Sequence, residues 1–158
     1  MKKKNTLLLF LCLFSLWAVA QEKKPVKIAC VGNSITYGSG IKNQFQNSYP
    51  GLLSQLLGEG YDVRNFGISA RVLLNKGDHP YMHEQKFRDL LAFQPDIVTI
   101  KLGTNDSKPW NWRYGKDFKK DLTEMLDILQ ELPSKPKIYL CLPVPAVKRN
   151  FGINDSVI

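Results

Sequence analysis

Three short polar segments of the sequence contain residue types that could together catalyse attack on a carbonyl group. The first segment, Gly32-Asn33-Ser34, directly follows the apolar run over residues 28–31. A serine at the carboxyl end of a buried strand can present its hydroxyl as a nucleophile. Attack on an ester creates an oxyanion, and each preorganised N–H donor lowers the barrier by about 3 kcal/mol. Gly67 and Asn105 also follow apolar runs, so we expect the backbone N–H groups of Ser34 and Gly67 and the Asn105 amide to be the donors.

The first segment also has plainer interpretations. Ser34 could only cap the N–H groups of a strand-to-helix turn. A turn rich in Gly, Ser and Thr after a first strand can instead cradle phosphate, so a flavodoxin-like FMN site over residues 33–39 is an alternative. That alternative assigns no function to Gly67 and Asn105.

The elements that must position these residues alternate between strand and helix patterns. Near-continuous apolar runs predict four strands, over residues 27–31, 62–66, 96–102 and 137–142. Right-handed crossovers turn this β-α-β-α-β-α-β order into a parallel sheet with helices on both faces, the third strand lying between the first and the fourth. Since the carboxyl ends of parallel strands share one edge, Ser34, Gly67 and Asn105 should converge there.

Apolar residues at helical spacing predict the helices between these strands. The first helix should begin near Ser48 and Pro50 and end at Gly58, with Leu52, Leu53, Leu56 and Leu57 forming its apolar face. The second contains Phe87, Leu90 and Leu91 and ends before Pro95, and the third extends from Phe118 toward Pro133.

The three polar segments resemble the first three blocks of the SGNH hydrolases, also called GDSL-type esterases. The matching residues are Gly32-Asn33-Ser34-Ile35-Thr36, Asn65-Phe66-Gly67-Ile68-Ser69 and Gly103-Thr104-Asn105-Asp106-Ser107. The resemblance implies a flavodoxin-like three-layer α/β/α fold and a serine esterase for small acyl groups, acetyl above all, without cofactor or metal. It also implies Ser34 as nucleophile and Gly67 and Asn105 as oxyanion donors. Asn33 stands where many members carry aspartate, at a position outside the catalytic triad.

The family's general base belongs to an Asp-x-x-His block after a fifth strand, and the sequence has no match to it. Asp155 is followed only by Ser156, Val157 and Ile158. A serine without a neighbouring base is a poor nucleophile, so we expect the chain to be a truncated and nearly inactive esterase.

The only histidines are His79 and His83, on the connection after the second strand. That connection leaves the sheet on the edge of Ser34, so either could act as a substitute base. A metal pair is disfavoured, because Pro80 interrupts the helix that ligands at this spacing need.

Trp110 and Trp112 follow the third block and could form an apolar shelf for a sugar ring, aided by Arg113 and Tyr114. In the family, such a loop suggests carbohydrate esters rather than long acyl chains. The tryptophans could instead pack against the start of the third helix. A catalytically inactive protein that binds sugar esters is a further alternative.

The amino-terminal segment predicts export. Lys2, Lys3 and Lys4 precede an apolar run over residues 7–19, and Ala18-Val19-Ala20 suits cleavage before Gln21. Residues 1–20 are therefore interpreted as a signal peptide and residues 21–158 as one domain, secreted or periplasmic and without a lasting membrane anchor. Removal of these lysines lowers the formal net charge of +8, so no nucleic-acid partner is expected.

The cysteines of the mature chain, Cys30 and Cys141, lie in apolar runs and are expected to be buried thiols. With a strand between them they would be roughly 10 Å apart, beyond the reach of a disulfide.

Overall fold

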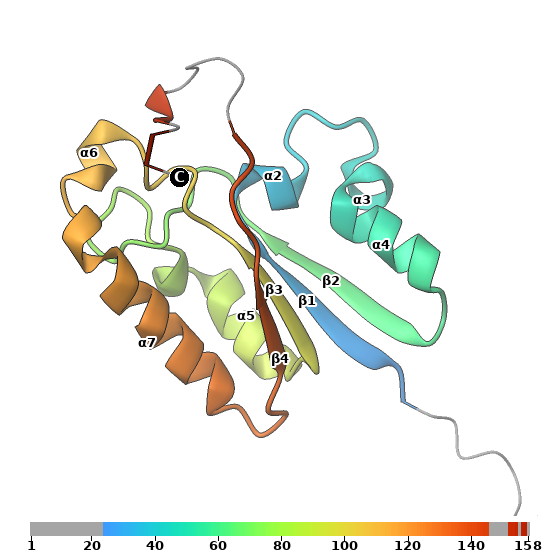
Figure 1. The fold of residues 1–158 in the computed structure, drawn as a ribbon. Coiled ribbons are helices and arrows are strands. Elements are labelled where there is room, and N and C mark those ends of the chain that lie inside the picture. The colour runs from blue at the N-terminus through green and yellow to red at the C-terminus, as the bar shows by residue number, and fades with distance from the viewer. Residues whose placement is uncertain (1–23, 146–151, 155, 158) are drawn as a thin grey trace, which may run out of the picture.

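A parallel β-sheet forms the centre of the protein in the computed structural model, which describes residues 24–145, 152–154 and 156–157. Its strands lie in the order β2-β1-β3-β4, all parallel (Figure 1). They span Val26–Gly32 (β1), Tyr61–Gly67 (β2), Ile97–Lys101 (β3) and Lys137–Leu140 (β4). All four predicted strands are therefore confirmed, as is the position of the third between the first and the fourth.

Helices cover both faces of the sheet, which confirms the predicted α/β class. Figure 1 shows α2 (Ser34–Tyr37), α3 (Gln44–Asn47) and α4 (Tyr49–Leu57) on one side, and α5 (Gln85–Phe93) and α7 (Phe118–Gln130) on the other. The short helix α6 (Pro109–Trp112) lies between β3 and α7, and single 3-10 turns occur at Tyr81–His83 and Gly115–Asp117.

The main core lies between the sheet and the pair α5 and α7. β1 and β3 contribute Val31, Val98 and Ile100, all buried, and the helices contribute Leu90 and Met125. Water does not reach the interface between the strands and these two helices, so both sides of the interface need apolar side chains.

Tyr81 brings a polar group into this core. Its hydroxyl donates a 2.6 Å hydrogen bond to the Phe66 carbonyl oxygen, and burial raises the pKa of the Tyr81 hydroxyl well above its usual range.

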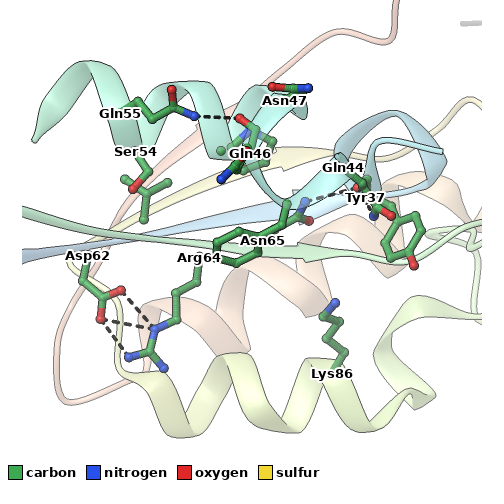
Figure 2. A pocket seen from close by; sticks show the side chains of 14 residues that line it. Tyr37, Gln44, Gln46, Asn47, Ser54, Gln55, Asp62, Arg64, Asn65 and Lys86 are labelled. Carbon is green, nitrogen blue, oxygen red and sulfur yellow. Dashed lines mark hydrogen bonds and ion pairs between the residues drawn. The ribbon is translucent and has the colours of Figure 1, made fainter. Parts of the chain in front are cut away.

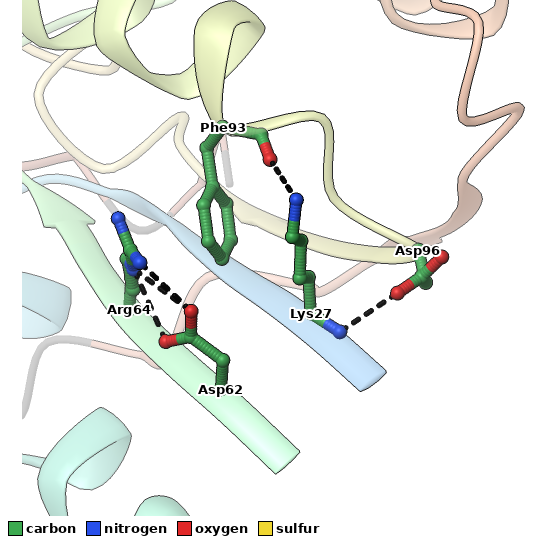
Figure 3. A network of polar contacts seen from close by, with 5 residues as sticks. All are labelled: Lys27, Asp62, Arg64, Phe93 and Asp96. Carbon is green, nitrogen blue, oxygen red and sulfur yellow. Dashed lines mark hydrogen bonds and ion pairs between the residues drawn. The ribbon is translucent and has the colours of Figure 1, made fainter. Parts of the chain in front are cut away.

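A network at the amino end of the sheet ties β1 and β2 to α5 (Figure 3). The Lys27 ammonium donates to the Phe93 carbonyl oxygen at 3.0 Å, at the carboxyl end of α5, where a cation is favoured. The Lys27 backbone N–H donates to the Asp96 carboxylate at 2.8 Å. The Arg64 guanidinium lies 4.2 Å from the centre of the Phe93 ring and pairs with Asp62. These contacts fix the end of the sheet opposite Ser34.

Two predictions about apolar residues were wrong in part. Leu52 and Leu56 of the predicted apolar face of α4 are exposed, Leu56 by 84%, because α4 turns Pro50, Leu53 and Leu57 inward instead. Cys141 is exposed as well, whereas Cys30 is a buried thiol as predicted. Cys141 follows the edge strand β4, which has no described neighbour on its outer side.

The predicted signal peptide and its cleavage site lie outside the described residues. Among the residues that the structure does describe, none of the helices has the length and apolar character needed to cross a bilayer.

Candidate active site

Ser34 is the first residue of α2, immediately after the turn that ends β1. The Asn33 side-chain oxygen accepts the Ile35 N–H at 3.0 Å and so caps the helix. Capping is thus done by Asn33 rather than by Ser34. The Ser34 side chain is partly exposed and has no hydrogen-bond partner within the described part of the chain.

Gly32 makes this abrupt strand-to-helix turn sterically possible. A Cβ atom there would lie 2.1 Å from the Thr36 hydroxyl oxygen and 2.9 Å from the Lys101 carbonyl oxygen. Any other residue would push α2 away from the ends of β1 and β3. The glycine therefore keeps Ser34 at the rim of the sheet.

Gly67 ends β2 directly beneath α2. A Cβ atom there would lie 2.3 Å from the Tyr37 backbone nitrogen, so close packing of α2 on β2 also requires glycine. The Gly67 N–H, a predicted oxyanion donor, donates to the Asn65 side-chain oxygen at 2.8 Å. The Asn65 amide nitrogen in turn donates to the Thr36 carbonyl oxygen at 2.9 Å. A substrate oxygen would have to share or displace the bond to Asn65.

Asn105 is buried between β3 and α6. Its side-chain nitrogen donates one N–H to the Arg71 carbonyl oxygen at 3.1 Å. The other N–H of the amide has no partner among the described residues, so it is available to a substrate oxygen. The Asn105 backbone oxygen accepts the Asn111 side-chain amide at 3.0 Å. The first bond orients the side-chain amide, and the second holds the backbone of Asn105.

Asp106 holds the segment around Asn105 to the connection after β2. One carboxylate oxygen accepts the N–H groups of both Leu73 and Leu74 at 2.8 Å, and the whole group is buried. The second carboxylate oxygen has no partner in the described residues. Burial raises the pKa of Asp106, and the hydrogen bonds from the backbone only partly offset this.

The sequence interpretation gave Asp106 no role. The available signal was an acidic residue next to Asn105, between apolar and small residues. The N–H groups that donate to it lie more than thirty positions earlier in the chain, and no pattern in the sequence pairs them with Asp106.

Further polar contacts join the same two connections. Asp121 of α7 accepts the Asn75 N–H at 2.8 Å, and Asn111 accepts the Asp78 N–H at 2.9 Å. The connection after β2 is therefore linked both to the segment after β3 and to α7.

The two tryptophans at the rim differ in their surroundings. The Trp112 ring packs 5.9 Å from the Phe118 ring at the start of α7, as the packing interpretation expected. The Trp110 ring is 48% exposed and donates its N–H to Asp78 at 3.1 Å. The Lys108 ammonium lies 5.6 Å from the centre of that ring. Of the two tryptophans, Trp110 is therefore the one whose ring a ligand could reach.

Both histidines are exposed. The His79 carbonyl oxygen accepts the Val72 N–H at 3.1 Å in a short bridge, and His83 ends a 3-10 turn. Neither imidazole is hydrogen-bonded to Ser34 in the described structure. The described residues also contain no group of three or more His, Cys, Asp or Glu side chains that could hold a metal ion.

One known protein similar to this chain is an esterase. An acetylxylan esterase of Xylanibacter ruminicola is 48% identical over 156 residues, covering 88% of this chain and 32% of the relative. The chain thus spans about a third of that relative's length.

Solved structures share the fold at lower identity. A carbohydrate acetylesterase family member from Sinorhizobium meliloti has a TM-score of 0.62 at 20% identity, covering 84% of this chain and 74% of that one. The native aryl esterase of M. smegmatis has a TM-score of 0.54 at 23% identity, covering 73% and 62%.

The profile of the GDSL-like Lipase/Acylhydrolase family matches residues 30–157, which include Ser34, Gly67 and Asn105. The chain belongs to the GDSL-like lipase/acylhydrolase family.

Proposed function

We propose that this chain is the part of a carbohydrate acetylesterase that holds the nucleophile and the oxyanion donors. The proposal rests on the start of α2, where Asn33 and not Ser34 caps the helix. Asn33 satisfies the helix N-terminus, which leaves the Ser34 hydroxyl available for chemistry. The acetylxylan esterase relative supports acetyl groups on xylan as the substrate.

In the proposed reaction, the Ser34 oxygen attacks the ester carbonyl carbon and passes its proton to a base. The oxyanion accepts hydrogen bonds from the N–H groups of Ser34 and Gly67 and from the Asn105 amide. The alcohol leaves with a proton, and water then releases acetate from Ser34. The base would be the histidine of an Asp-x-x-His segment, which the printed sequence does not contain.

The experiment compares residues 21–158 with a version extended by such a segment, each with a Ser34→Ala control. The extended version should release acetate from acetylated xylo-oligosaccharides in a Ser34-dependent manner, and the shorter chain should be nearly inactive. Ser34-dependent turnover by the shorter chain at the rate of the longer one would contradict the missing base and point to His79 and His83.

An inactive sugar-ester binding protein is the second candidate, favoured by the exposed Trp110 ring at the rim. It predicts that the extended version binds acetylated xylo-oligosaccharides without releasing acetate. The FMN alternative has less support, because the Ile35 N–H that a phosphate would need already donates to Asn33.

We also propose export with cleavage after Ala20. Amino-terminal sequencing of protein recovered from an exporting host should give Gln21 as the first residue. An intact Met1 would overturn this proposal.

A further inference from the structure

A groove of about 900 Å³ lies outside the candidate active site, along the outer edge of β2. Figure 2 shows α3 and α4 on one side of this strand and Lys86 of α5 on the other. β2 is an edge strand of the sheet, so the groove follows an open border between the two helix layers.

Carboxamide side chains dominate the polar lining of the groove. They belong to Gln44, Gln46, Asn47, Gln55 and Asn65. A carboxamide carries both donors and acceptors but no charge, which suits the hydroxyl groups of a neutral ligand.

Several of these amides are already oriented by the backbone. The Asn47 nitrogen donates to the Lys42 carbonyl oxygen at 2.7 Å, and the Gln55 nitrogen donates to the Gln46 carbonyl oxygen at 2.8 Å. The Gln44 nitrogen likewise donates to the Tyr37 carbonyl oxygen. Each bond engages the nitrogen end, so the side-chain oxygen is left as an acceptor for a hydroxyl group.

Two exposed aromatic rings belong to the apolar part of the lining. Phe45 is 92% exposed, and Tyr37 is also exposed. Rings of this kind bind the C–H faces of sugars by apolar contact. The Phe45 backbone packs closely on α4, because a Cβ atom at Gly51 would lie 2.3 Å from the Phe45 carbonyl oxygen.

The charges that line the groove nearly cancel. The Arg64 guanidinium pairs with the Asp62 carboxylate at 2.8 Å. The remaining cation, Lys86, donates to the Gly67 carbonyl oxygen at 3.3 Å and lies 5.9 Å from the centre of the Tyr37 ring. A neutral polymer suits this nearly neutral groove lining better than a polyanion does.

The groove adjoins the candidate active site through α2. Tyr37, which lines the groove, lies three residues after Ser34, a rise of about 5 Å along the helix. Lys86, on the other side, contacts Gly67, the residue that ends β2 at the rim.

We propose that this groove binds the unsubstituted sugar backbone of a neutral polysaccharide next to the ester that Ser34 attacks. The proposal rests on the proposed carbohydrate-ester function and adds a site distinct from the rim formed by Trp110. An extended peptide added to the edge of β2 is the competing occupant.

The test measures binding of a linear, unacetylated xylo-oligosaccharide to residues 21–158 by calorimetry and by amide chemical-shift changes. The double variant Phe45→Ala/Gln46→Ala should weaken binding about tenfold or more. Leu56→Ala is the matched control, since it removes an exposed apolar side chain of α4 that does not line the groove. It should bind the oligosaccharide as the parent chain does.

Equal binding by the double variant and the Leu56→Ala control would overturn the proposal. So would binding of a Val/Thr-rich extended peptide along β2 without any binding of the oligosaccharide. Because the probe carries no ester, binding can succeed while the extended version fails to release acetate. Such a result would separate failure of the esterase proposal from failure of the groove proposal.

Discussion

Replacing Asp106 by alanine should destabilise the protein by about 2–4 kcal/mol. The change removes the acceptor of two buried N–H groups, those of Leu73 and Leu74, each 2.8 Å from the same carboxylate oxygen. A buried N–H left without an acceptor costs about 1–3 kcal/mol, which gives about 2–6 kcal/mol for the pair. Removing the carboxylate returns part of its own burial cost, which is visible in its raised pKa.

Urea unfolding of residues 21–158, followed by far-ultraviolet circular dichroism, measures the effect. Asp117→Ala is the matched control, because Asp117 links α7 to the same connection through an exposed ion pair with Lys76. This control should change the free energy of unfolding little. An Asp106→Ala variant as stable as the control would refute the view that the carboxylate holds the two connections together.

Three further predictions concern the site and the thiols. In the extended version, Asn105→Ala should lower kcat by about a hundredfold with little change in KM, since the amide acts on the developing charge; a rise in KM alone in steady-state kinetics would contradict this role. Because burial raises the pKa of Asp106 above 3.8 in the folded state, the folded protein binds its proton more tightly than the unfolded chain does. The stability that this proton contributes is therefore complete below pH 3.8 and is lost as the pH rises through the folded pKa. Urea unfolding of Asp106→Asn should lack this fall with rising pH, so the difference in the free energy of unfolding between the parent and the variant should change over this range; a constant difference would count against the assignment. Cys141 should react with a thiol reagent in the folded protein, whereas Cys30, buried and with a raised pKa, should react only after unfolding; two fast thiols would contradict the described burial.

The sheet could be predicted from the sequence because its signals are local. Continuous apolar runs over residues 27–31 and 96–102 are typical of strands buried on both faces, and Gly32 and Gly103 mark where those runs end. Chain connectivity and crossover handedness then restrict the strand order. The same reasoning locates Ser34 at the rim.

Burial and long-range polar contacts could not be predicted in this way. Leu56 has the type and spacing of a core residue, yet its exposure depends on which elements lie beside α4. The contact of Asp106 with Leu73 joins segments far apart in the chain. The Asn33 cap and the Asn65 bond to Gly67 depend on side-chain rotamers, which the order of residues does not determine.

The bond between the Gly67 N–H and the Asn65 side-chain oxygen makes this donor of the proposed site selective for acceptors stronger than an amide oxygen. A neutral ester carbonyl oxygen accepts a hydrogen bond about as strongly as the Asn65 side-chain oxygen does. Replacing Asn65 by the ester at the Gly67 N–H therefore gains little free energy. An oxyanion is a much stronger acceptor, since charge-assisted hydrogen bonds are roughly twice as strong as neutral ones. As a proposed oxyanion donor, the Gly67 N–H would therefore discriminate between the bound ester and the tetrahedral intermediate, and its binding energy would lower the barrier without strengthening the binding of substrate or acetate.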